Sequence, residues 1–244
     1  MDSLSIVIPA YNEAGSIAAT LSDALAVGPR VSHRLEVVVC DDGSRDDTAA
    51  IVRTAAAADP RVRLIGRRTN AGIEASIRAL YASADSAWVF LNAADRQWPM
   101  SSLEPMAAAV ADGADLVIGV RRNKRAVYSP YRRVLSWSFE HVVRRLGAPS
   151  ADPGSIKLGR RELLAAAVVA DGVFAEGERV IRAARTGARI VEVPVEFHRR
   201  GSGVALGARR AVVARAALDV VAVTVSLVTG WPRPSPPRID LDTE

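Results

Sequence analysis

Short apolar runs alternate with segments of helical periodicity along the first half of the chain. The apolar runs are 4–8, 35–40, 62–65, 88–91 and 116–120. They lack clear period-two alternation, which is typical of strands that are buried on both faces of a parallel sheet. A predicted helix follows each of the first four runs. This alternation predicts an α/β fold with a mostly parallel, doubly wound sheet and flanking helices.

The pattern changes after the fifth predicted strand, where a basic loop begins. Three helices and one further strand are predicted there: 132–146, 161–169, 176–185 and 189–197. Pro194 lacks a backbone donor and therefore favours the edge of the sheet for the last strand.

Residues 211–231 are almost wholly apolar and predict a C-terminal helix. Its polar residues, among them Asp219 and Ser226, share one narrow face. A membrane span needs about 20 apolar residues, and the unbroken run 220–228 is shorter. Two interpretations stay open: the helix packs on the core of the protein, or it lies at a membrane surface. The proline-rich tail, 231–244, is predicted to be disordered.

The composition of the chain limits which partners and metals it is expected to bind. The chain has 244 residues, 49% of them hydrophobic, and a net charge of +5. A basic protein suits an anionic partner such as a diphosphate, a lipid phosphate or a membrane surface. Aromatic residues make up only 5% and no basic stripe accompanies them, so no nucleic-acid partner is predicted. Cys40 is the single cysteine and histidines are few, so a metal would be bound by oxygen. The N-terminus resembles no signal peptide, which indicates a cytoplasmic protein.

The stretch Trp88–Pro99, WVFLNAADRQWP, is the centre of the predicted site. Its apolar half is a buried strand that ends at Asn92, and Asp95 follows directly. Ligands of open α/β sheets bind at the carboxyl ends of the strands. On this stretch alone, Asp95 is equally well explained as a ligand-binding carboxylate or as the cap of a helix beginning near Met100.

Four motifs together give the sequence a family resemblance. They are SIVIPAYNEAGSI, VVVCDDGSRDDT, the strand ending before Asp95, and EVPVEFHRRGSG. The sequence resembles the family 2 glycosyltransferases of the GT-A fold, especially polyprenyl-phosphate sugar synthases, over about residues 3–210. The resemblance implies one domain and a tail: a nucleotide-binding half at about 1–120, an acceptor half at 121–210, an apolar helix at 208–230 and the tail at 231–244.

The resemblance also implies how the donor nucleotide is bound. The residues expected around the base, ribose and diphosphate are Pro9, Tyr11, Glu13, Cys40, Asp42, Ala94 and Asp95. Tyr11 offers a planar face to the base, while Glu13 and Asp42 offer acceptors to hydroxyl or N–H groups. Considered singly, Tyr11 is also compatible with ordinary packing and Asp42 with a turn or cap.

Two family motifs are incomplete in this chain. The metal motif D-x-D-x-Q reads Ala93, Ala94, Asp95, Arg96, Gln97, so its first carboxylate is missing. We expect Asp95 and Gln97 to bind Mg²⁺ or Mn²⁺ with reduced affinity. In the second motif, Arg200 and Gly203 match, but Ala205 and Leu206 replace a serine and a lysine. Candidates for the lost positive charge are Arg121, Arg132, Arg133, Arg199 and Arg209.

The implied reaction is inverting transfer of a sugar from a nucleoside diphosphate sugar to a lipid phosphate or glycan acceptor. The leaving diphosphate is expected to be stabilised by a metal held by Asp95 and Gln97 and by the cations Arg121 and Arg200. An anionic lipid phosphate needs no general base, whereas a hydroxyl acceptor would need one of the following carboxylates: Asp152, Glu176 and Glu178.

The incomplete motifs keep a second interpretation open, a relative that binds nucleotide sugars with little or no turnover. A nucleotidyltransferase or a Rossmann dehydrogenase is a third, although no G-x-G-x-x-G follows the first strand. The leading interpretation places the enzyme at the cytoplasmic face of a membrane, bound peripherally. The base, the sugar, the acceptor and the oligomeric state are not predicted.

Overall fold

A computed structural model describes residues 1–122, 128–198 and 210–234. Its strands are β1 (Ser3–Ala10), β2 (Arg34–Asp42), β3 (Val62–Arg67), β4 (Trp88–Leu91), β5 (Leu116–Arg121), β6 (Lys157–Arg160) and β7 (Ile190–Val195). Its helices are α1 (Ile17–Val31), α2 (Thr48–Ala58), α3 (Ile73–Ser83), the 3₁₀ turn η1 (Met100–Ser102), α4 (Leu103–Ala111), α6 (Pro130–Arg145), α7 (Arg161–Leu164), α8 (Ala175–Arg185) and α9 (Arg210–Thr229). Every strand expected from the apolar runs is present.

The seven strands form one sheet in the order β3-β2-β1-β4-β6-β5-β7. Strand β6 runs antiparallel to β4 and β5, and the other pairs are parallel. The predicted mostly parallel sheet is therefore confirmed, with β7 at its edge. Because β1 lies between β2 and β4, the strand order reverses there, and the carboxyl ends of these strands border the crevice where such sheets bind ligands.

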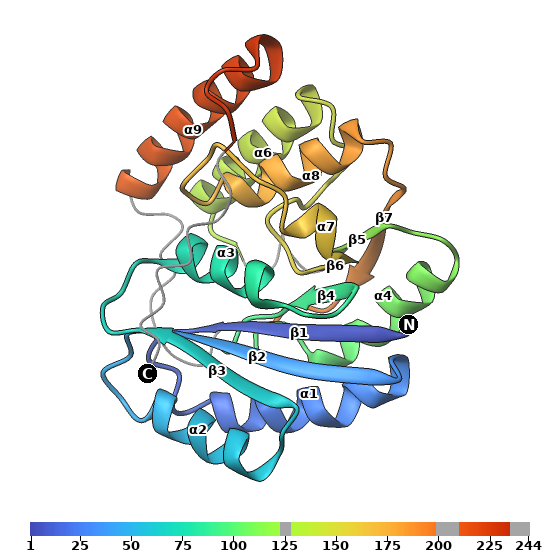
Figure 1. Ribbon diagram of the computed structural model, residues 1–244. Coiled ribbons are helices and arrows are strands. Elements are labelled where there is room, and N and C mark those ends of the chain that lie inside the picture. Colours follow the sequence, from blue (N-terminus) through green and yellow to red (C-terminus); the bar gives the residue numbers. More distant parts are fainter. Residues whose placement is uncertain (123–127, 199–209, 235–244) are drawn as a thin grey trace.

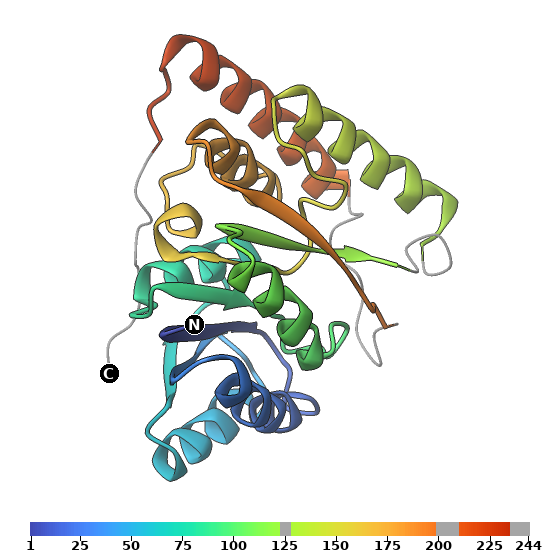
Figure 2. The same cartoon turned by 90° about the vertical axis from the view of Figure 1, so that its right-hand side faces the viewer.

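Helices cover both faces of the sheet (Figures 1 and 2). Each face carries its own apolar core. Val37 and Val39 of β2 pack with α1, α2 and α4. Val38 and Cys40 of the same strand pack on the opposite face, where α3, α6, α7 and α8 lie. This two-sided burial explains why the strands read as continuous apolar runs.

One predicted helix is mostly wrong. The stretch 161–169 was expected to be helical, but α7 ends at Leu164. The backbone N–H groups of Val169 and Ala170 instead donate to the Glu178 carboxylate, at 2.9 and 2.8 Å. A buried carboxylate from α8 therefore holds this backbone in a non-helical path.

The sequence predicts that the apolar run 220–228 is too short to span a membrane, but the apolar part of α9 is longer than this run. Within the described residues, Ala211–Thr229 is long and apolar enough to cross a membrane, and only 17% of its most apolar stretch is buried. Its polar residues Asp219 and Ser226 face inward and are buried, whereas Leu218, Val221 and Val228 are exposed. The helix thus packs on the protein through these polar residues together with Val220, Val223 and Leu227, and it leaves the rest of its apolar surface exposed.

Candidate functional site

Hydrogen bonds between the loops after β1 and β2 fix one side of the site. The Asn12 N–H donates to Ser44 Oγ at 2.9 Å, and the Glu13 N–H donates to Thr48 Oγ1 at 2.8 Å. Asn12 has a φ of 54°, a left-handed conformation that asparagine tolerates. Tyr11 lies at this carboxyl edge of the sheet and is 39% exposed. A ring in this position is open to a ligand, as the predicted base contact requires.

The carboxylate of Asp42 is already hydrogen-bonded within the protein. Its two carboxylate oxygens accept from the N–H groups of Ala71 and Gly72 at 3.0 and 2.8 Å, and Arg67 lies 3.5 Å away. The side chain is buried and orders the connection between β3 and α3. This is the turn role that the sequence left open. The predicted nucleotide contact stays a prediction, and it would require these bonds to rearrange.

The neighbouring Asp41 is the residue that the sequence analysis missed. It is only 7% exposed, and its Oδ1 has no hydrogen-bond partner among the described residues. The other oxygen accepts from the Ser44 N–H at 3.3 Å. A buried carboxylate oxygen without a donor is unfavourable, so a hydrogen bond from a water or a ligand would stabilise it. The tandem aspartates at the end of β2 were the available signal, since adjacent residues of a strand point to opposite faces.

The other predicted nucleotide-binding residues surround this edge at different depths. Pro9 and Cys40 are paired inside the sheet, and burial raises the pKa of the Cys40 thiol. Glu13 accepts a hydrogen bond from Ser16 Oγ at 2.7 Å. The Ala94 carbonyl accepts from Thr20 Oγ1 at 3.1 Å. Their nucleotide contacts remain predictions.

Asp95 and Gln97 lie on the loop after β4. This loop is hydrogen-bonded to the segment that follows β7. Asp95 Oδ1 accepts from the Gln97 N–H at 3.1 Å. Gln97 in turn donates through Nε2 to the His198 carbonyl at 3.2 Å, while the His198 N–H donates to the Gln97 carbonyl at 2.8 Å. These contacts order the loop that carries the predicted metal ligands.

The donor set of this loop fits a hard cation. Among the described residues, no group of three or more histidine, cysteine, aspartate or glutamate side chains is suited to a metal. Mg²⁺, however, is commonly bound through one or two carboxylates, substrate phosphates and water. Asp95 and Gln97 supply oxygens of that kind, so they fit a cation that is bound together with a diphosphate.

Arg121 and Asp152 come together as a buried ion pair. Arg121 Nε donates to Asp152 Oδ2 at 2.6 Å, Nη2 donates to Oδ1, and Nη1 contacts the Tyr128 hydroxyl. Rings of Trp98, Tyr128 and Phe197 surround the guanidinium at 5.2–5.4 Å. Both oxygens of Asp152 are engaged and the residue is 2% exposed. This arrangement favours a positioning role for Asp152 over the general-base role predicted for a hydroxyl acceptor.

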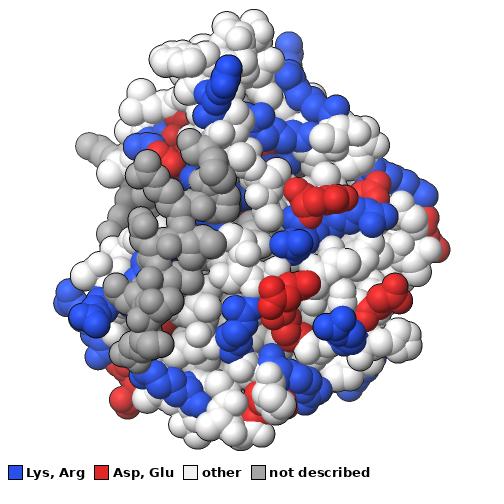
Figure 3. Space-filling view, viewed as in Figure 1, with Lys and Arg blue, Asp and Glu red and all other residues white. Residues whose placement is uncertain are grey.

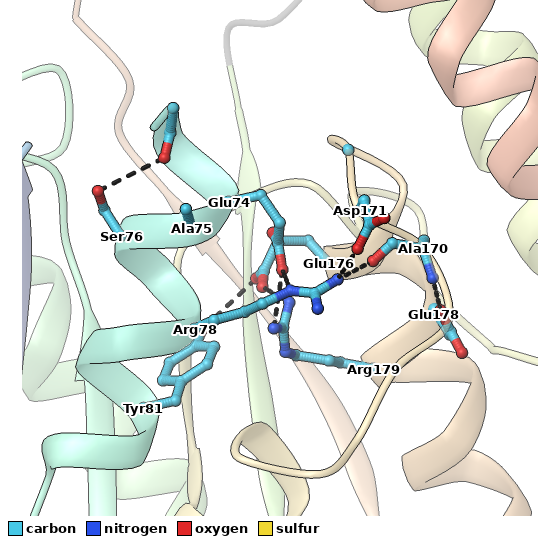
Figure 4. Close-up of polar contacts among 12 residues, drawn as sticks. Glu74, Ala75, Ser76, Arg78, Tyr81, Ala170, Asp171, Glu176, Glu178 and Arg179 are labelled. Atoms are coloured by element: carbon cyan, nitrogen blue, oxygen red, sulfur yellow. Dashed lines mark hydrogen bonds and ion pairs between the residues drawn. The ribbon is translucent and has the colours of Figure 1, made fainter. Parts of the chain in front are cut away.

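Glu176 belongs to a buried polar network shown in Figure 4. Lys157 Nζ and Arg179 Nη1 each donate to it at 2.7 Å, and Arg179 Nη2 donates to Glu74 at 2.9 Å. Burial raises the pKa of Glu176, but Lys157 and Arg179 outweigh burial and hold that pKa below its ordinary value. For Glu74 burial prevails, and its pKa is raised. A carboxylate held between two cations is a weak base, so Glu176 is a structural residue in this arrangement.

The remaining predicted cations are placed only in part. Arg200, together with Arg199 and Arg209, lies outside the described residues, as do Gly203, Ala205 and Leu206. Arg132 and Arg133 both contact Tyr128: the first lies over its ring at 4.2 Å, and the second donates to its carbonyl at 3.1 Å. The structure therefore gathers Arg121, Arg132 and Arg133 around one tyrosine.

Comparison with known proteins identifies relatives of this chain. The sequence pattern described as glycosyl transferase family 2 matches residues 5–166. An undecaprenyl-phosphate 4-deoxy-4-formamido-L-arabinose transferase from Pseudomonas savastanoi pv. phaseolicola is 35% identical over 170 residues, which cover 68% of this chain and 50% of that protein. A protein of the same name from Shewanella sediminis is 35% identical over 59% of this chain and 44% of its own length. The chain thus spans about half the length of the named relatives it matches.

Solved structures share the fold. Glucosyl-3-phosphoglycerate synthase from Mycobacterium tuberculosis, in complex with phosphoglyceric acid, has a TM-score of 0.73 at 18% identity, covering 91% of this chain and 80% of that one. The same enzyme in complex with Mn²⁺ and UDP-glucose has a TM-score of 0.70 at 20% identity, covering 93% and 79%. At this identity the likeness shows the fold alone, which is the GT-A fold expected from the sequence.

Proposed function

The chain belongs to glycosyl transferase family 2, and we propose that it transfers a sugar from a nucleoside diphosphate sugar to a polyprenyl phosphate, with inversion at the anomeric carbon. The named relatives are undecaprenyl-phosphate sugar transferases, which supports a lipid phosphate acceptor. The structural neighbour in complex with UDP-glucose supports a uridine nucleotide as the donor.

The observation that carries this proposal is the buried, unpartnered Oδ1 of Asp41. It lies at the carboxyl edge of β2, paired in register with Ala10, directly before Tyr11. A nucleobase stacked on Tyr11 would offer a ring N–H to this oxygen. Because an unpaired buried acceptor strongly disfavours ligands that lack the donor, Asp41 would select for the base.

A divalent cation, Mg²⁺ or Mn²⁺, is part of the proposal, with Asp95 and Gln97 as its protein ligands. When bound, the cation supplies positive charge to the leaving diphosphate. Ala93 stands where a second carboxylate is expected, so we propose a weaker site than a complete motif would give.

This chain's own residues orient the reacting groups. The Arg121 guanidinium, paired with Asp152 and ordered by its aromatic neighbours, lies beside the loop of Asp95, and Arg200 is proposed to add positive charge there. The acceptor phosphate is already anionic and needs no base to remove a proton. Since Glu176 and Glu178 are bound within the protein, a hydroxyl acceptor would lack an obvious base among them.

A second candidate is a nucleotide-sugar-binding relative with little turnover. The missing carboxylate at Ala93 favours it, because a weak cation site would stabilise the leaving diphosphate poorly. We also propose that the protein works at the cytoplasmic face of a membrane and contacts it peripherally through α9, whose apolar face is exposed.

Sugar transfer tests these candidates directly. Purified protein is incubated with UDP- and GDP-sugars and farnesyl phosphate, with and without Mn²⁺, and binding is measured alongside transfer. Sugar-linked farnesyl phosphate that forms only with Mn²⁺ supports the transferase. Tight nucleotide binding without transfer to any lipid phosphate would instead identify the binding relative.

A further inference from the structure

A groove of about 580 Å³ opens between α3, α6 and the first half of α9. Its lining is mostly apolar and includes Ile77, Leu135, Phe139, Val142, Val213 and Val220. The α6 residues that line it run from Arg132 to Val142, and at 1.5 Å per residue they give this wall a length of about 15 Å. The groove therefore offers an elongated apolar surface.

One end of the groove meets the candidate site. Tyr128, Arg132 and Ser136 line it together with the apolar residues. The Tyr128 hydroxyl also contacts Arg121, the cation beside the Asp95 loop. The groove thus has a polar, basic end near the reacting groups and an apolar remainder.

The charged residues on the floor are already neutralised by the protein. Glu74 and Glu176 line the groove, but Arg179 binds both of them (Figure 4), and Lys157 also donates to Glu176. These carboxylates need no cation from a ligand. The floor therefore tolerates a hydrocarbon.

The outer faces of the same two helices indicate where such a hydrocarbon would come from. Both helices lie at the end of the molecule away from α1 and α2 (Figures 1 and 2). Leu218, Val221 and Val228 of α9 are exposed, and Val134 and Trp137 of α6 are more than 60% exposed. Figure 3 shows mostly neutral side chains over this end, with basic ones beside them.

An apolar face flanked by basic residues is typical of a membrane-surface helix. The side chains of Leu218, Val221 and Val228 support this assignment, because they stay exposed while α9 buries Asp219 and Val223 against the protein. The hydrocarbon chains of a bilayer are the occupant that matches this chemistry.

We infer that the groove between α3, α6 and α9 binds the isoprenoid chain of the acceptor, with the phosphate at the Tyr128 end. The inference rests on the proposed lipid phosphate acceptor and adds the site of its chain. Helices α6 and α9 contact the membrane, so the chain passes from the bilayer into the groove without crossing water.

Chain-length dependence of binding tests the inference. Farnesyl phosphate and methyl phosphate are titrated calorimetrically against the protein and two variants. Ala216→Phe places a ring in the groove, whose lining includes Ala216. Ala214→Phe adds the same ring to an exposed position on the same helix that does not line it. Melting temperatures verify that both variants fold.

We expect the unaltered protein and Ala214→Phe to bind farnesyl phosphate at least tenfold more tightly than methyl phosphate, and Ala216→Phe to lose this preference. A preference retained by Ala216→Phe, or absent from the unaltered protein, would overturn the inference. So would light scattering that shows a dimer abolished by Ala216→Phe, since a second copy would then occupy the groove. Failure of the proposed function looks different: the chain preference remains while no sugar is transferred.

Discussion

Asp41 and Asp42 are adjacent at the end of β2, yet the structure gives them separate tasks. Asp42 binds two N–H groups of the β3–α3 connection, whereas Asp41 keeps one oxygen without a partner among the described residues. The isosteric variants Asp41→Asn and Asp42→Asn should therefore separate nucleotide binding from stability.

The expected magnitudes follow from the bonds that each variant changes. In Asp42→Asn one charge-assisted bond is replaced by a contact between two donors, which costs about 1.5–3 kcal/mol of folding free energy. For a domain of this size that loss lowers the melting temperature by about 3–12 °C. Asp41→Asn removes an unpaired buried charge, so its stability should be unchanged or higher. If its amide group turns toward the base, nucleotide binding weakens by about 1.5–3 kcal/mol, or about 10- to 150-fold.

Urea unfolding and calorimetric titration with UDP and GDP measure the two effects. Asp47→Asn serves as the control, because Asp47 is exposed in the same loop and makes no side-chain cap bond. The reasoning is refuted if Asp42→Asn keeps full stability but loses nucleotide affinity while Asp41→Asn binds normally. In that case Asp42 is the nucleotide ligand and its bonds to the loop are incidental.

Three further predictions concern the cation, the buried network and the tail. Restoring the carboxylate with Ala93→Asp should make UDP binding more dependent on Mn²⁺, and Asp95→Asn should abolish that dependence. Calorimetric titrations of UDP with and without Mn²⁺ measure the dependence. Lys157→Met should destabilise the fold by about 3–5 kcal/mol, because it leaves the buried Glu176 short of a cation. The lowered pKa of Glu176 means that its stabilisation is present at neutral pH and is lost as the pH falls below the ordinary value of 4.5; Glu176→Gln should flatten this acid dependence of the unfolding free energy. Deleting 231–244 should leave the melting temperature unchanged, because this polar tail has little apolar surface to bury.

The strands could be predicted because each one is marked by a run of consecutive apolar residues. The bounds of β4, Trp88–Leu91, agree with the predicted run, since a polar residue follows it immediately. The pairing of β6 was not predictable in the same way. Lys157 is fully buried in that strand, and its charge is tolerated only because Glu176 reaches it from α8. A partner 19 residues away leaves no local pattern.

The same limit applies to the site. The tandem aspartates place two carboxylates at the predicted ligand edge, but the pattern did not say which of them is bound within the protein. That choice depends on the N–H groups of Ala71 and Gly72, which come from another connection of the sheet. Likewise, the ion pair of Arg121 with Asp152 joins residues 31 positions apart and could not be predicted from either motif.

Helix α9 shows how a periodic pattern can identify the faces of a helix without saying which is buried. Its polar stripe would ordinarily face water. Here Asp219 accepts from the Gly172 N–H at 2.9 Å and from Arg215 at 3.1 Å. These bonds offset the cost of burying a carboxylate, which an apolar contact alone could not do. With Asp219 buried beside Val223, the helix leaves Leu218, Val221 and Val228 exposed, and these apolar side chains are the surface through which we propose that α9 contacts a bilayer.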